Sequence, residues 1–142
     1  MNSDSNIRFG PMLRYEFLPS DFNPMFLFIG DSRDLAGLAE LLRKFARQPN
    51  EVSLVRNLPA VHPQTIVSLL PADPEFGMRP NREEFAWYLN AWQAEQIAER
   101  IDRLADEAER SGSEIFEIGS DGEIPVKVSR GEFTDDFLVS RR

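Results

Sequence analysis

The sequence predicts an α+β fold, with one twisted, mostly antiparallel (mixed) sheet of about six or seven strands and two helices packed on one face. Three observations support this fold. Several short segments alternate apolar and polar residues, two longer segments have the apolar spacing of an amphipathic helix, and turns rich in proline and glycine separate them. A chain of 142 residues fits a single domain. We expect residues 1–8 to be flexible and residues 131–142 to form a mobile tail.

Two strands are predicted near the start of the chain. Residues 13–17 alternate apolar side chains with Arg14 and Glu16, which is typical of a strand with one solvated face. Residues 25–29 are apolar without interruption, which favours a central strand covered on both faces or a strand at an interface. Gly30 ends this second strand.

An amphipathic helix follows, because Asp31 or Ser32 can cap its N-terminus and Pro49 ends it. Its apolar residues fall on one face, namely Leu35, Leu38, Leu41, Leu42 and Phe45. Two shorter strands are expected after it, at residues 51–55 and 65–70.

Residues 71–82 contain three prolines, and we interpret them as a surface loop within the domain. A strand at residues 85–89 comes next. Asn90 and Gln93 then have the spacing of a capping box at the start of the longest helix, which Gly112 is expected to end. The apolar stripe of this helix comprises Ala94, Ile97, Ala98, Ile101, Leu104, Ala105 and Ala108.

The chain closes with a predicted hairpin of strands 115–118 and 124–128. Asp121 and Gly122 lie between them and form a strong turn signal. Because proline cannot donate a backbone hydrogen bond, Pro125 places the second strand toward the edge of the sheet.

The order strand, helix, strand, strand therefore occurs twice, at residues 25–70 and 85–128. The two segments share almost no identical residues, so we favour separate use of a common α+β unit over an internal duplication. Short connections around each helix are expected to make its flanking strands parallel neighbours through a right-handed crossover.

The charge of the chain is unevenly distributed. Seventeen of the 24 carboxylates but only nine of the 16 Lys and Arg residues follow Pro71, so the second half carries the whole net charge of -8. Such an acidic chain, with a pI near 4.7 and no basic stripe, is not expected to bind nucleic acid. It is suited to meeting a basic protein surface.

The long helix concentrates this charge. Five carboxylates fall within an arc of about 80 degrees, at Glu95, Glu99, Asp102, Asp106 and Glu109. We call this set the acidic ridge. Like charges at these spacings weaken a helix by a few tenths of a kcal/mol per pair. The ridge is therefore either an ordinary solvated face or a docking surface for a basic protein.

Candidates for catalysis are few. The chain has no cysteine, no phosphate-binding glycine-rich loop and one histidine, His62, in a proline-bounded loop without an acid nearby. No cofactor is predicted. Carboxylates could still assemble a metal or acid-base site in three dimensions. The candidates are Glu83 and Glu84 before one strand and Glu132, Asp135 and Asp136 after the last one.

Residues 126–133, which include the run Lys-Val-Ser-x-Gly-Glu-Phe, together with 135–137 resemble the closing strand and turn of small uncharacterised bacterial proteins. By analogy of fold and composition, small acidic proteins of this kind are similar to immunity proteins and antitoxins that neutralise basic toxins. We therefore expect a cytoplasmic protein-binding module, neither catalytic nor membrane-bound. The alternatives are a self-associating structural domain, such as a homodimer, and a small-ligand or carboxylate-dependent enzyme domain.

Overall fold

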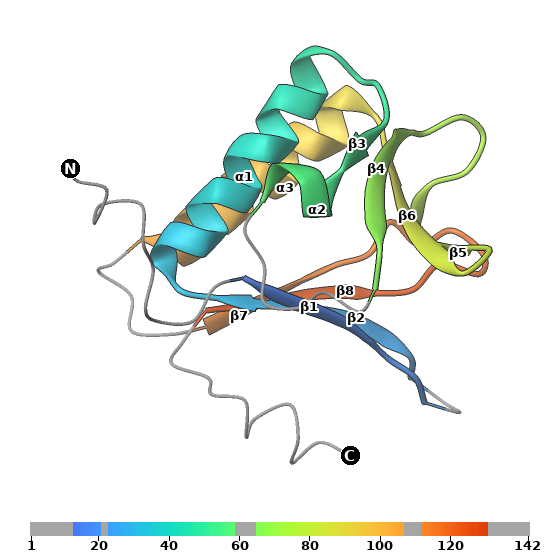
Figure 1. Cartoon of the computed structure of the whole chain (residues 1–142), viewed down its shortest axis with the longest axis horizontal. Coiled ribbons are helices and arrows are strands. Elements are labelled where there is room, and N and C mark those ends of the chain that lie inside the picture. The colour runs from blue at the N-terminus through green and yellow to red at the C-terminus, as the bar shows by residue number, and fades with distance from the viewer. Residues whose placement is uncertain (1–12, 21–22, 59–64, 107–111, 131–142) are drawn as a thin grey trace.

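The computed structural model describes residues 13–20, 23–58, 65–106 and 112–130, and all structural statements concern these residues. They form eight strands and three helices (Figure 1). In chain order the elements are β1 (Arg14–Leu18), β2 (Met25–Gly30), α1 (Ser32–Arg47), β3 (Val52–Ser53), α2 (Leu54–Asn57), β4 (Val67–Pro71), β5 (Gly77–Asn81), β6 (Glu84–Leu89), α3 (Ala91–Ala105), β7 (Gly112–Phe116) and β8 (Val126–Arg130).

The α+β class is confirmed, but the expectation of one sheet is wrong. The strands form two four-stranded mixed sheets, with the orders β1-β2-β8-β7 and β3-β4-β6-β5. Each of the long helices α1 and α3 leads from one sheet to the other, so the strands that flank it are not the parallel neighbours that we predicted. The parallel pairs are β2 with β8 and β4 with β6. Each sheet therefore combines strand pairs from both halves of the chain.

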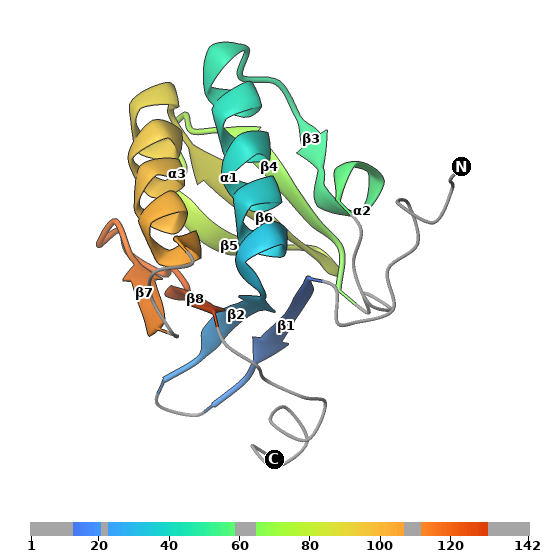
Figure 2. The same ribbon diagram turned by 90° about the vertical axis from the view of Figure 1, so that its left-hand side faces the viewer.

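Helices α1 and α3 lie side by side and antiparallel in the angle between the two sheets (Figures 1 and 2). Both helices turn an apolar stripe inward, so the core fills the space that they share with the two sheets. The short helix α2 lies along the side of α1 that faces away from α3 (Figure 2).

A constant interval relates the two halves of the molecule. Strands β2 and β6 begin at Met25 and Glu84, which are 59 positions apart. Strands β4 and β8 begin at Val67 and Val126, which are also 59 positions apart. The parallel pairing of Phe26 with Val126 is matched at this interval by that of Phe85 with Val67. We call β1 to β4 the first unit and β5 to β8 the second unit. The repeated order seen in the sequence is thus a repeated arrangement in space.

The two long helices follow the same interval. Asp31 and Asp34 form a capping box on α1, and Asn90 and Gln93 form one on α3. Their buried positions also correspond. The pairs are Leu35 with Ala94, Leu38 with Ile97, Ala39 with Ala98, Leu42 with Ile101, Phe45 with Leu104 and Ala46 with Ala105. Nearly identical burial thus arises from different side chains.

Equivalent residues of the two units touch each other in the core. The rings of Phe26 and Phe85 lie 5.2 Å apart, and those of Phe28 and Trp87 stack at 5.8 Å. Because these rings come from β2 and β6, they join the two sheets directly. Aromatic pairs at such distances contribute about 0.5–1.5 kcal/mol beyond the burial of their area.

Strand β2 is central and buried on both faces, as its continuous apolar run predicts. The prediction for β8 was wrong, because it lies between β2 and β7 and not at an edge. Pro125 lies just before the first residue of β8, so its missing N–H falls outside the strand, while its carbonyl accepts a hydrogen bond of 2.9 Å from the Phe26 amide.

Three further expectations need correction. The predicted loop 71–82 contains β5, an edge strand whose outer side carries, among the described residues, only the bridge between Met78 and Ile124 and therefore tolerates Pro80. The predicted strand 51–55 is extended for only two residues and then turns into α2, which buries Leu54 completely. Helix α3 ends at Ala105, its last buried residue, and Gly112 begins β7 instead of ending the helix.

Candidate functional site

The structure divides the predicted acidic ridge. Glu95 and Glu99 are exposed on α3, and no ion pair engages either of them within the described residues. Asp106 is exposed at the C-cap of the helix, and Glu109 lies outside the described residues. Of the predicted set, Glu95 and Glu99 remain as carboxylates that face solvent from the body of the helix.

Asp102 is committed to a different contact. Its Oδ2 lies 2.5 Å from Nη2 of Arg43 on α1. Arg43 occupies in the first unit the position that Asp102 occupies in the second. The hydrogen bond from Arg43 to Asp102 raises the pKa of the guanidinium, with smaller contributions from the charges of nearby carboxylates. Asp102 therefore joins the two helices and is a poor candidate for binding a partner.

The exposed side of α3 also carries a large apolar residue that the sequence reasoning missed. Trp92 is 69% exposed, and it stands on the same side of the helix as Glu95 and Glu99. Beside it a cleft of about 130 Å³ runs between α3 and the end of β7. Its apolar walls are formed by Trp87, Trp92, Ile97, Phe116 and Ile118. We call it the Trp92 cleft.

Arg100 closes one side of the Trp92 cleft, and its charge is already neutralised. Its guanidinium forms an ion pair with Glu114, with Nε donating to the carboxylate at 3.0 Å. The same group lies 4.6 Å from the centre of the Phe116 ring, a cation–π distance. A partner entering the cleft therefore meets an apolar wall and a satisfied arginine.

The loop after β7 is held by a carboxylate. Glu123 accepts hydrogen bonds from the amides of Ile118, Gly119 and Ser120, at 2.8, 2.7 and 3.0 Å. The predicted turn at Asp121 and Gly122 is present in this loop. Glu123 thus fixes Ile118 at the mouth of the Trp92 cleft and is not itself available as an acid-base group.

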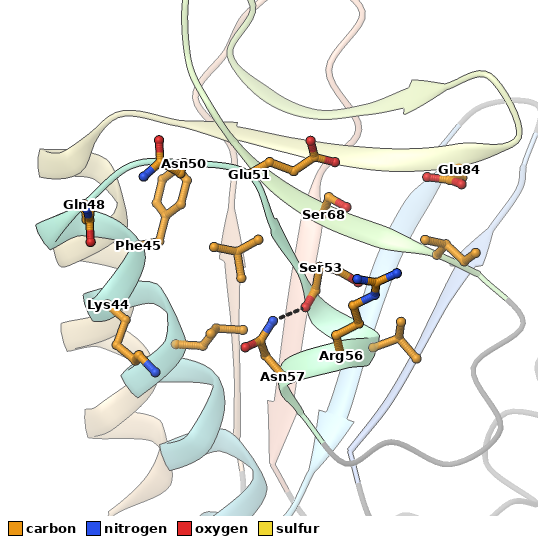
Figure 3. A pocket seen from close by; sticks show the side chains of 14 residues that line it. Lys44, Phe45, Gln48, Asn50, Glu51, Ser53, Arg56, Asn57, Ser68 and Glu84 are labelled. Atoms are coloured by element: carbon orange, nitrogen blue, oxygen red, sulfur yellow. Dashed lines mark hydrogen bonds between the residues drawn. The ribbon is translucent and has the colours of Figure 1, made fainter.

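A larger cleft lies in the first unit, between the end of α1, β3, α2 and β4 (Figure 3). It encloses about 840 Å³. Its lining carries charges of both signs, with Lys44 and Arg56 as cations and Glu51 and Glu84 as carboxylates, among polar and apolar side chains (Figure 3). Asn57 donates a hydrogen bond of 2.6 Å to the Ser53 carbonyl and so holds the end of α2 against β3.

The structure does not bring the described candidates for catalysis and metal binding together in one site. Glu84 lines the larger cleft, whereas Glu83 lies in the turn that precedes β6 and does not line the cleft. His62 and the trio Glu132, Asp135 and Asp136 lie outside the described residues. In the described part of the chain, no three His, Cys, Asp or Glu side chains gather as a metal site would require.

Comparison of the chain with protein families, curated proteins and solved structures gave no match in any of the three. No helix in the described ranges is long and apolar enough to cross a membrane. The exposed surface of α3 and the two clefts are therefore the features of the described residues that bear on function.

Proposed function

We propose that this protein is an acidic protein-binding module that acts by association and not by catalysis, as an immunity protein or antitoxin does toward a basic partner. The observation that carries the proposal is the exposed side of α3. There Trp92 projects beside two carboxylates, Glu95 and Glu99, that no ion pair engages in the described residues. Tryptophan is enriched among residues that dominate binding energies, and exposed charges speed the encounter with an oppositely charged partner.

The proposed partner is a basic protein surface, met in the cytoplasm. The net charge of -8 favours such a partner at long range. A self-associating domain is less favoured, because two copies would bring like-charged α3 surfaces together. Nucleic acid is disfavoured for the same electrostatic reason.

The experiment compares three immobilised forms of the protein in one lysate at low salt: wild type, the Glu95→Lys/Glu99→Lys double variant, and Glu40→Lys. Glu40 occupies on α1 the position that Glu99 occupies on α3, and it is also exposed. We expect wild type and Glu40→Lys to retain the same basic protein and the double variant to lose it. Association of that purified protein should be at least tenfold slower with the double variant, with a weaker dependence on salt.

Equal retention of the same proteins by all three forms would contradict the proposal. The variants should fold normally, because surface substitutions usually change stability by less than about 0.5 kcal/mol. Equal thermal unfolding midpoints, measured before the capture experiment, would verify this.

A second candidate, a small-ligand domain, is favoured only by the 840 Å³ cleft of the first unit, whose volume is in the range of ligand pockets. Its lining is half polar and contains charges of both signs, which suits a zwitterionic or polar molecule. Binding that is lost in Glu84→Gln and retained in Glu83→Gln, tested by NMR against a metabolite library, would support it.

A further inference from the structure

The relation between the two units shows which surface is open in only one of them. At the interval of 59 residues, Gly37 of α1 corresponds to Gln96 of α3, and Leu41 corresponds to Arg100. In the first unit this side of the helix is covered by the chain itself. Leu58, which follows α2 and packs on the core, lies 3.7 Å from the Cβ position of Gly37.

The second unit has no such cover in its described residues. By strand register, Phe116 is the counterpart of Leu54, and both are buried. After Leu54 the chain turns back along α1, but after Phe116 it runs toward β5. There Ser120 accepts a hydrogen bond of 2.9 Å from Arg79, and the Ile124 amide donates one of 2.9 Å to Met78.

The space that Leu58 fills in the first unit thus corresponds to the Trp92 cleft in the second. Its volume of about 130 Å³ is close to the roughly 150 Å³ of a cavity that holds a benzene ring. It can therefore take one large apolar side chain. Trp92 and Ile118, which are 69% and 40% exposed, would be covered by the segment that carries this side chain.

The charges near the Trp92 cleft indicate which residues should flank the apolar side chain in the partner segment. Glu117 lines the cleft, and Glu95 and Glu99 lie outside its lining, on the side of α3 that carries Trp92. All three are exposed, and within the described residues none of them forms an ion pair. Arg100, the cation of the lining, is neutralised by Glu114. The surroundings of the cleft are therefore acidic, and a segment with lysine or arginine next to its apolar residue is complementary to them.

We propose that the Trp92 cleft binds one leucine-, methionine- or phenylalanine-sized side chain from a basic segment of a partner protein. This inference depends on the proposed binding function and specifies the chemistry of the partner at that site. The partner segment would take the place that Leu58 of the chain itself takes in the first unit.

The test uses a library of random twelve-residue peptides displayed on phage, selected against the wild-type protein. Enriched peptides, made synthetically, are then titrated into the protein by isothermal calorimetry. We expect them to carry a large apolar residue within three positions of lysine or arginine. Their affinity should fall at least tenfold in Trp92→Ala and in Glu99→Lys. It should stay within twofold in Val55→Ala, a matched truncation of an exposed apolar residue in the first unit.

Several results would overturn the inference. These are no enrichment over an empty support, enrichment of acidic peptides, or peptides that bind Trp92→Ala as well as wild type. Unchanged peptide binding to Glu99→Lys would overturn the requirement for a basic segment. If peptides failed but lysate capture still depended on Glu95 and Glu99, the cleft would be excluded and the proposed function retained. If peptides needed Trp92 while capture ignored the carboxylates, the proposed function would fail instead.

Discussion

The two units of this protein share the arrangement of their strands and long helix, and they differ in whether the chain covers the outer side of that helix. The first unit turns its own chain back as α2 and packs Leu58 beside Gly37. The second unit places Gln96 and Arg100 at the corresponding helix positions and leaves the Trp92 cleft open. The same arrangement of hairpins and helix is thus closed by its own chain in the first unit and open in the second, where we propose that a partner binds.

The difference in charge follows the same division. The first unit is neutral in the sequence, and the second carries the excess carboxylates, including the exposed Glu95, Glu99 and Glu117. A surface that is both open and charged costs stability, because like charges repel and apolar area stays in water. The second unit therefore has the features expected of a binding surface, and the first unit those of a scaffold.

The aromatic stack between the two sheets tests whether the stability of each unit depends on the other. Phe28→Ala and Trp87→Ala remove equivalent rings that stack across the two sheets, and each should lower the free energy of unfolding by about 3–5 kcal/mol. The double variant should cost less than the sum of the two, because each single change already breaks the shared stack. Urea denaturation of the four proteins measures both effects.

Trp92→Ala is the matched control for this prediction, since it removes an exposed tryptophan and should cost less than about 0.5 kcal/mol. Costs that add fully for Phe28 and Trp87 would mean that the stack contributes nothing of its own. A cost below about 1 kcal/mol at one of the two positions would break the equivalence of the units.

The elements could largely be predicted from the sequence, because their determinants are local. The capping boxes at Asp31 and Asn90 and the apolar stripes of both helices depend on spacings of three and four residues. The division into two sheets could not be predicted. Alternation tells which face of a strand is apolar, but it does not tell which other strand lies beside it, and two hairpins can pair within a unit or between units.

The candidate site was predicted only in part, also for physical reasons. Helix geometry placed Glu95 and Glu99 on an exposed face, but it could not show that Arg43 of another helix reaches Asp102. Trp92 gave a signal that went unused. It lies opposite the apolar stripe of α3, and tryptophan is enriched among the residues that dominate the binding energy of protein interfaces.

Tyr15 allows a second test at a position that has an equivalent in the other unit. By register, Tyr15 of β1 corresponds to Met78 of β5. The buried hydroxyl of Tyr15 has no hydrogen-bond partner among the described residues. Because a buried unsatisfied hydroxyl is destabilising, Tyr15→Phe should raise the free energy of unfolding by about 1 kcal/mol at neutral pH. Denaturation in urea at pH 7 measures this, and a loss of stability would show that the hydroxyl is bonded in solution.

Tyr15 should also make the free energy of unfolding depend on pH. Burial raises the pKa of Tyr15 in the folded state, so above about pH 10 the unfolded chain releases a proton that the folded chain retains. The contribution of Tyr15 is therefore fully present below pH 10 and is lost as the pH rises further. Tyr15→Phe should show a shallower loss of stability than wild type between pH 9.5 and 11. Parallel curves would contradict the assignment.

The smallest effect tests the contact that distinguishes the two units. Gly37 lies inside α1, where glycine costs roughly 0.5–1 kcal/mol relative to alanine. A Cβ at this position would meet Leu58 Cδ2 at 3.7 Å, an ordinary van der Waals distance, so Gly37→Ala should raise the free energy of unfolding by about that amount. Gln96→Ala at the equivalent position of α3 should change it by less than about 0.5 kcal/mol. Both are measured by urea denaturation.

If Gly37→Ala were destabilising, α2 would pack on α1 more closely than this contact indicates. Glycine would then be required for closing the first unit, and its absence from α3 would explain why the second unit stays open.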